Sequence, residues 1–268
     1  MSFARNIEQT DPPRPARETL PTMYDLPSEN PEEPGLPDEF HDFQPELLRI
    51  TFQPPAYLPE QVFSASDMNL YYDVRYPNRY KRPDWFGVVG VSRLYEGRDL
   101  RLSYVIWQEG VSPFVVVELL SPSTEDEDLG KTEQEDRQPP TKWHVYEQIL
   151  RIPYYVVFSR YTERLQVFSL QGGHYQQLNL IEHKVWMADI GLGLGLWQGE
   201  YAGIHRLWLR WYDQKGNWIS TEAEQERQRA EAERQRAEAE RQRAEAERQR
   251  AERLAERLRA LGVNPDDD

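Results

Sequence analysis

The chain has 268 residues, no cysteine and a formal net charge of −14. The missing cysteines exclude disulfides, thiolate metal sites and cysteine nucleophiles, and the five histidines lack the spacing of a zinc site. The acidic excess argues against non-specific adhesion to nucleic acid, which is itself a polyanion. Because no apolar run reaches about 18 residues and the N-terminus has no apolar leader, we expect a soluble cytoplasmic protein that does not enter the membrane.

Composition divides the chain into four segments. Residues 1–40 are rich in proline and acidic side chains, which predicts a partly disordered arm. Residues 41–219 carry short apolar runs separated by turns, such as WFGVVGV, RLSYVIW and LQVFSL, and they predict a folded, sheet-rich domain. Residues 220–261 form a charged helical segment, and residues 262–268 form an acidic tail.

The middle of the folded region predicts a strand, a helix and a second strand. FVVVELL and YYVVF are continuously apolar, as strands buried on both faces tend to be. Between them, Thr141 can cap a helix that Pro153 ends. One face of this helix is expected to carry Tyr146, Ile149 and Leu150. The later runs alternate, and Gly172-Gly173 predicts a hairpin, so the fold class is α/β with antiparallel additions.

Two repetitive stretches, a glycine-rich one and a charged one near the C-terminus, are interpreted as structural and not as functional motifs. GLGLGL at 191–196 neither follows a clear strand nor opens a helix, so we interpret it as an edge strand or loop and not as a phosphate cradle. The C-terminal segment repeats ERQRAEA every seven residues, and pairs such as Arg227–Glu231 and Glu231–Arg234 can hold a solvated single helix. A coiled coil is the alternative, since Leu254, Leu258 and Leu261 offer a short stripe for a homo-oligomer such as a dimer.

Two carboxylates stand beside apolar strands. Asp84 opens WFGVV, and Glu118 interrupts FVVVELL, although glutamate is seldom buried without a partner. Asp84 could cap a turn, and Glu118 could meet an arginine or mark where the strand reaches solvent. Taken together, two carboxylates on neighbouring strands favour a hard-cation site for Mg²⁺ or Mn²⁺.

Nearby cations complete the pattern. Lys142 lies four residues before Tyr146, so it shares the helix's apolar face and should point inward, where it could stabilise charge at a phosphorus centre. A solvated lysine at the helix start is the alternative reading. Lys81 and Arg82, next to Asp84, could contact phosphates, or they could belong to a solvated loop.

RPDWFGVVGV, PFVVVELLSPSTEDEDLGK and KWHVYEQILRIPYYVVF together resemble the Uma-type restriction endonuclease family, a branch of the PD-(D/E)xK nucleases. The resemblance covers about residues 40–200. It implies a restriction-endonuclease-like mixed β-sheet core flanked by helices, here followed by a long charged C-terminal helix. It also implies Mg²⁺- or Mn²⁺-dependent hydrolysis of DNA phosphodiester bonds.

The resemblance assigns roles to individual residues. Asp84 matches the family's PD aspartate and Glu118 its second acid, and these two with the Leu119 carbonyl would hold the metal. Leu120 stands where the superfamily motif has its lysine, so Lys142 on the following helix would position the attacking hydroxide. Lys131 is the alternative lysine, because an apparent insertion after DLG makes the register uncertain.

The resemblance leaves the activity open. A nuclease-like domain that serves only as a binding or assembly module, with the charged helix as a spacer, is the alternative to an endonuclease. Retention of Asp84, Glu118 and Lys142 favours the enzyme, whereas the negative charge and the missing DNA-reading helix favour the module. A nuclease acting on RNA or single strands ranks third.

Overall fold

The computed structural model describes residue 12 and residues 38–120, 128–130 and 139–261. The chain divides into two compact units, Met1–Ile219 and Ser220–Asp268. Within the described ranges, no helix has both the length and the apolar character needed to span a bilayer. The Pro-rich arm of residues 1–40 and the acidic tail lie almost wholly outside the described residues, so both stay predictions.

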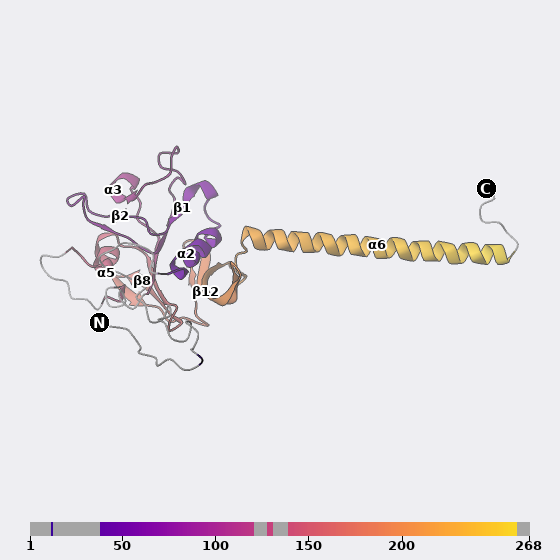
Figure 1. Ribbon diagram of the computed structural model, residues 1–268. Coiled ribbons are helices and arrows are strands. Elements are labelled where there is room, and N and C mark those ends of the chain that lie inside the picture. The colour runs from indigo at the N-terminus through magenta and orange to yellow at the C-terminus, as the bar shows by residue number, and fades with distance from the viewer. Residues whose placement is uncertain (1–11, 13–37, 121–127, 131–138, 262–268) are drawn as a thin grey trace. The chain divides into compact units, whose positions relative to one another are not determined.

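A six-stranded mixed sheet forms the centre of the first unit (Figure 1). Its order is β1 (Val62–Ala65), β4 (Trp85–Val89), β6 (Val115–Leu119), β7 (Tyr154–Ser159), β8 (Arg164–Gln171) and β9 (His174–Gln177). Only β6 and β7 run parallel, and the other neighbours are antiparallel. The expected strand–helix–strand unit and the Gly172-Gly173 hairpin are therefore confirmed.

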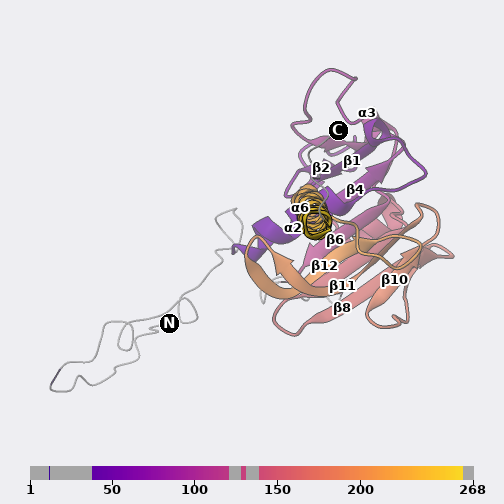
Figure 2. The same cartoon turned by 90° about the vertical axis from the view of Figure 1, so that its right-hand side faces the viewer.

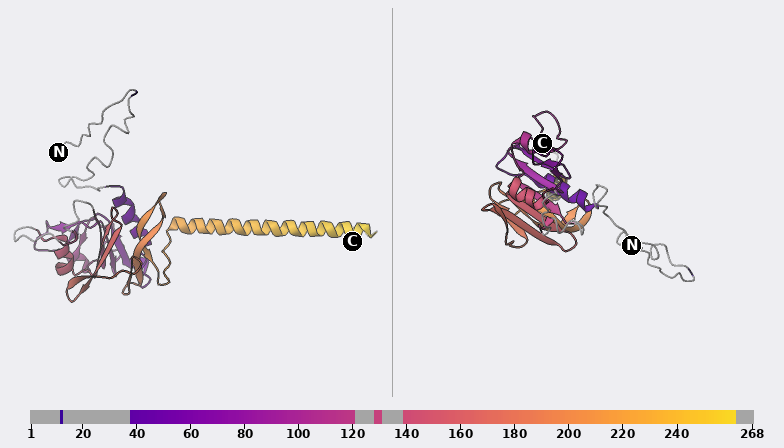
Figure 3. Two further views of the ribbon diagram at one scale, coloured as in Figure 1. Left: turned by 90° about the horizontal axis from the view of Figure 1, so that it is seen from below. Right: turned by 90° about the vertical axis from the view of Figure 1, so that its left-hand side faces the viewer.

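Two smaller sheets accompany the central one. The first consists of β10 (Lys184–Met187), β11 (Leu192–Tyr201) and β12 (Ile204–Tyr212), which lie together as a separate curved sheet (Figure 2). The second pairs β2 (Leu70–Tyr71) with β3 (Tyr80–Lys81) and β5 (Tyr104–Val105). The short helices η1 (Pro59–Gln61) and α3 (Ile106–Glu109) lie in the connections. Figure 3 shows this unit from two further sides.

Alternating side chains of the central sheet enter two cores. Val115, Val117 and Leu119 pack with α2 (Phe40–Thr51) and with the β10–β12 sheet. Val116, on the other face, packs with the β3–β2–β5 sheet and with the segment α5 (Lys142–His144) and η2 (Val145–Ile149). The central sheet is thus covered on both faces, which explains why β6 and β7 are continuously apolar.

The helix between β6 and β7 is shorter and wider than an α-helix. Thr141 caps it as expected, since its side chain accepts a hydrogen bond from the His144 amide. Residues Val145–Ile149 form a π-turn, in which the Leu150 amide donates to the Val145 carbonyl. This wider turn changes which side chains share a face. Tyr146 and Leu150 are buried, but Ile149 is 37% exposed, so its placement on the inner face was wrong.

Three other predictions need correction. Residues 40–51 form α2, a helix that the prediction of a sheet-rich domain over residues 41–219 did not include. RLSYVIW forms only the two-residue β5 before the chain turns into α3. Residues 192–196 of GLGLGL belong to β11, which is the central and not an edge strand of its sheet. Gly193 is required there because a Cβ atom would overlap the Tyr212 ring.

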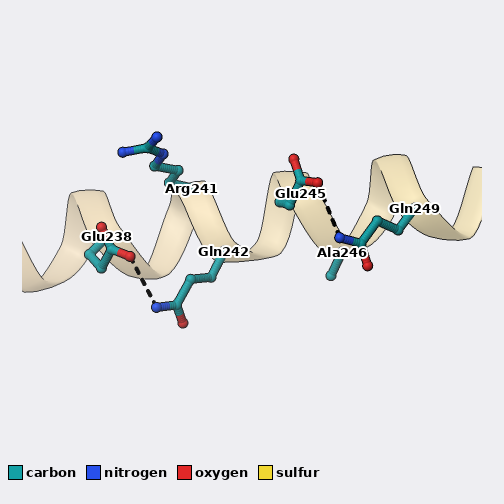
Figure 4. A pocket seen from close by; sticks show the side chains of 6 residues that line it. All are labelled: Glu238, Arg241, Gln242, Glu245, Ala246 and Gln249. Carbon is teal, nitrogen blue, oxygen red and sulfur yellow. Dashed lines mark hydrogen bonds between the residues drawn. The ribbon is translucent and has the colours of Figure 1, made fainter.

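The second unit contains α6, a helix over Glu222–Ala260 with no buried residue. Its sequence holds eleven glutamates and eleven arginines, so the helix carries no net charge. Glutamine side chains donate to glutamates one turn earlier, as in Gln242 to Glu238 (3.1 Å) and Gln249 to Glu245 (3.1 Å) (Figure 4). In this described helix Glu231 pairs with Gln235 (3.0 Å) and not with Arg227 or Arg234 as expected.

Thr221 fixes the start of α6 and offers a test. Its hydroxyl accepts from the Glu224 amide (3.2 Å), and its own amide donates to the Glu224 carboxylate (2.8 Å), which is a capping box. We expect Thr221→Ala to destabilise α6 by about 1 kcal/mol. Ser220→Ala is the control, because Ser220 contacts the helix through its backbone carbonyl. Thermal melts followed by circular dichroism check this, and equal melts for the two variants would contradict it.

Candidate active site

The strand pairing brings the two predicted carboxylates together. Asp84 directly precedes β4, Glu118 lies in β6, and the pairing of Trp85 with Val117 places them opposite each other. The Leu119 amide donates to Asp84 Oδ2 (2.6 Å), and the Asp84 amide approaches Glu118 Oε2 (3.4 Å). Each carboxylate is therefore held by the backbone beside the other.

Lys142 also reaches this point. It is the first residue of α5, and its Nζ atom lies 3.1 Å from Glu118 Oε2 and 2.9 Å from Asp128 Oδ1. Its side chain is 17% exposed, whereas those of Glu118 and Asp128 are 0% and 1% exposed. The lysine expected to point inward therefore does so, and it keeps a narrow access to solvent.

Tyr146 holds the other oxygen of Glu118. The Tyr146 hydroxyl donates to Glu118 Oε1 at 2.9 Å, while Lys142 donates to Oε2. Lys142 and Tyr146 are four residues apart on one face of α5 and η2, so a single helical face grips both carboxylate oxygens. The orientation of Glu118 is fixed by these two contacts.

Asp128 is a third carboxylate of the site that the sequence analysis did not select. It pairs with Lys142 as a close ion pair, although the contact does not have the angles of a hydrogen bond. Its backbone carbonyl accepts from the buried Tyr155 hydroxyl (2.8 Å), which fixes the DLG segment against β7. Asp84, Glu118 and Asp128 thus surround one ammonium group.

The charges of these groups influence one another strongly. Burial raises the pKa of Glu118 well above its usual value, and the carboxylates of Asp128 and Asp84 raise it further against the opposing effect of Lys142. Burial also raises the pKa of Asp84. Burial alone would lower the pKa of Lys142, but the surrounding carboxylates raise it well above its usual value, so its ammonium stays protonated. The site therefore has fewer positive groups than carboxylates, one ammonium against three.

His41 supports the Leu119 carbonyl from the other side of the sheet. Its Nε2 atom lies 3.0 Å from the Leu119 oxygen, and its Nδ1 atom lies 2.9 Å from Asp38 Oδ1. Both contacts require an N–H on the ring, so the doubly protonated imidazolium satisfies both. Burial opposes this charge, but the hydrogen bond with Asp38 and the charge of Asp84 together raise the pKa of His41 above its usual value.

A divalent cation fits this donor set. Three carboxylates against one ammonium leave an excess of negative charge in a buried site, and a hard cation prefers oxygen ligands. Asp84, Glu118 and the Leu119 carbonyl, which has a second lone pair besides the one facing His41, are the groups that would hold it. Among the described residues, no three His, Asp or Glu side chains form a metal-binding group by themselves. Mg²⁺ commonly uses one or two carboxylates and keeps several water ligands, so two carboxylates and a carbonyl would suit it.

The other cationic residues selected from the sequence are not part of this cluster in the described residues. Arg82 forms an ion pair with Asp67 (2.9 Å), and its side chain is 41% exposed. It therefore does not neutralise Asp84. Lys81 ends β3 and is half-buried. Lys131, the alternative lysine, lies outside the described residues.

Three functional groups were missed from the sequence, for different reasons. Tyr146 had a usable signal, because its spacing from Lys142 places it on the same helical face. Asp128 opens the DLG motif on which the family resemblance partly rests, which was a usable signal, but it also ends a run of acidic residues and was given no role. His41 comes from a helix 78 residues before its partner Leu119, so only the fold brings them together.

The raised pKa of Glu118 predicts a pH-dependent stability of the metal-free protein. The folded state binds this proton more tightly than the unfolded state, so the contribution is complete below the ordinary value of 4.5 and is lost as the pH rises through the folded pKa. In EDTA, we expect the free energy of unfolding to fall from about pH 4.5 upward. Urea titrations should show a flatter pH profile for Glu118→Gln, and identical profiles would refute the assignment.

Tyr146→Phe tests the support of Glu118. Removing the hydroxyl leaves one oxygen of a fully buried carboxylate without its donor, which should destabilise the protein by about 1–3 kcal/mol. Tyr212→Phe is the control, since it removes a buried hydroxyl that donates only to the Val185 carbonyl. Metal affinity, measured by calorimetry, should fall for Tyr146→Phe alone.

Comparison with known protein families identifies the family of this chain. The profile of the Uma2 family, described as "Putative restriction endonuclease", matches residues 18–202. This range includes His41, Asp84, Glu118, Asp128 and Lys142. A search of the curated proteins found none that matches the chain. Since the family profile covers more than half of the sequence, the chain belongs to the Uma2 restriction endonuclease family.

Proposed function

We propose that the protein is a Mg²⁺- or Mn²⁺-dependent endonuclease that hydrolyses phosphodiester bonds of DNA. The observation that supports this most strongly is the group of three carboxylates around one ammonium, next to a backbone carbonyl at the end of β6. Glu118 and Asp128 are buried, and Asp84 is partly buried. Such a group holds more negative charge than its own cation balances. Family membership supports the same activity class.

The residues of the site would have different roles in hydrolysis. Asp84, Glu118 and the Leu119 carbonyl would bind the metal ion, which when bound acidifies water and neutralises phosphate charge. Tyr146 and Lys142 keep the Glu118 carboxylate in one orientation. Lys142 remains protonated and partly exposed, so its ammonium can orient the attacking water and stabilise negative charge on the phosphate.

The alternative is a module that uses the nuclease fold only for binding or assembly. The ion pairs of Lys142 with Glu118 and Asp128 support it, because they stabilise the site even without a metal. Calorimetry with Mg²⁺ or Mn²⁺ separates the two functions. An endonuclease should bind the metal ion, and Glu118→Gln should abolish that binding, whereas the module should bind no metal.

Three further predictions concern properties outside the site. They are action on RNA, homo-oligomerisation through the leucines of α6 and a cytoplasmic location.

Cleavage of plasmid DNA tests the proposed activity. With Mg²⁺ or Mn²⁺, we expect Asp84→Asn, Glu118→Gln and Lys142→Ala each to lower the rate at least about 100-fold, because each removes a group that acts on metal, water or phosphate. Lys184→Ala is the control for lost positive charge, since Lys184 lies in β10 over Tyr212. Cleavage by the three variants at the parent rate would rule out this site.

A further inference from the structure

We propose that Arg160 and Arg206 form a second phosphate-binding site, which holds the DNA backbone beside the cleavage site. This inference rests on the proposed function, because it assigns a flanking phosphate of the same substrate. It adds a binding site that lies on the opposite face of the central sheet from Lys142 and Tyr146.

The position of Arg160 follows from the parallel pairing of β6 and β7. Leu119 pairs with Phe158, so the chain just beyond β7 reaches the sheet edge where β6 ends. Arg160 follows β7 directly, and its guanidinium lies 2.9 Å from Asp38 Oδ2. The carboxyl ends of parallel strands share one edge of a sheet, so Arg160 and the metal-binding carbonyl lie at the same edge.

A short series of polar contacts joins the two sites. Arg160 contacts Asp38, Asp38 contacts His41 at 2.9 Å, and His41 contacts the Leu119 carbonyl at 3.0 Å. A phosphate bound at Arg160 would therefore lie a few nucleotides or less from one bound at the metal.

Arg206 brings a second guanidinium to the same place from β12. Its Cζ atom lies 4.3 Å from the centre of the Phe40 ring, and that of Arg160 lies 5.7 Å from the same centre. In the described part of the chain, the buried Nε atom of Arg206 has no hydrogen-bond partner. A buried donor without a partner is unfavourable, and an acceptor bound beside it would relieve that cost.

The local charge favours an anion. Two guanidiniums face one carboxylate, Asp38, and among the described residues the exposed Glu163 is the only other acid that acts noticeably on Arg206. Arg160 is 27% exposed, so a ligand can reach it. Paired guanidiniums match the oxygens of a phosphate group better than single ammonium groups do. A phosphodiester is therefore the chemical class that this site fits.

The salt dependence of DNA binding tests the proposal. Full-length protein in EDTA, which prevents metal-dependent cleavage, is titrated into labelled duplex DNA at several salt concentrations, and anisotropy gives the affinity. We expect Arg206→Gln to weaken binding at low salt by about 10-fold and to reduce the slope of log K against log salt by about 0.9, the value for one phosphate contact. Arg206→Lys, which keeps the charge, should restore most of the slope.

Arg164→Gln is the matched control. Arg164 is an exposed arginine at the start of β8, and its loss changes the net charge equally. For Arg164→Gln, the slope of log K against log salt should equal that of the parent. Thermal unfolding should show that both glutamine variants remain folded. The proposal is wrong if the parent does not bind DNA, or if Arg206→Gln and Arg164→Gln have the same slope.

Two further measurements distinguish the sources and the two proposals. If calorimetry detects Arg206-dependent binding of inorganic phosphate while the DNA slopes coincide, the site binds free phosphate and the assignment to DNA is overturned. If the parent binds DNA with an Arg206-dependent slope but never cleaves it, the phosphate site is supported and the endonuclease fails. If the parent cleaves DNA but Arg206→Gln leaves the salt dependence of binding unchanged, the endonuclease is supported and the phosphate site is wrong.

Discussion

The structure depends on a glutamate that has no contact with solvent. Glu118 lies in a central strand whose other side chains are valine and leucine, and its own side chain is 0% exposed. A buried carboxylate is costly unless its oxygens are hydrogen-bonded and its charge is balanced. The positions of Tyr146, Lys142 and the π-turn that presents them follow from that requirement.

The sequence predicted those features that depend on local pattern. The continuously apolar β6 and β7, the Thr141 cap and the inward Lys142 all follow from spacing along a single element. Asp84 and Glu118 could be linked because Asp84 opens one apolar strand and Glu118 interrupts the other. In each of these cases, the period of a strand or helix determines the direction of the side chain.

Features that depend on the fold or on backbone irregularity were not predictable in this way. Ile149 is exposed because the π-turn inserts an extra residue, and nothing in its sequence marks that change. Most of GLGLGL lies in a central strand, where Gly193 gives room to the ring of Tyr212 from the neighbouring strand β12. Asp128 and His41 join the site through contacts across the fold that no local pattern encodes.

The balanced composition of α6 has an electrostatic consequence. Because its glutamates and arginines are equal in number, the whole net charge of −14 resides in the rest of the chain. The helix therefore exerts little long-range force on a charged molecule, since opposite charges that alternate along it cancel within a Debye length of about 8–10 Å. A nucleic acid that approaches this protein is repelled by the acidic remainder except where arginines gather. Its direction of approach is thus selected largely by repulsion, and the longest element of the protein takes no part in that selection.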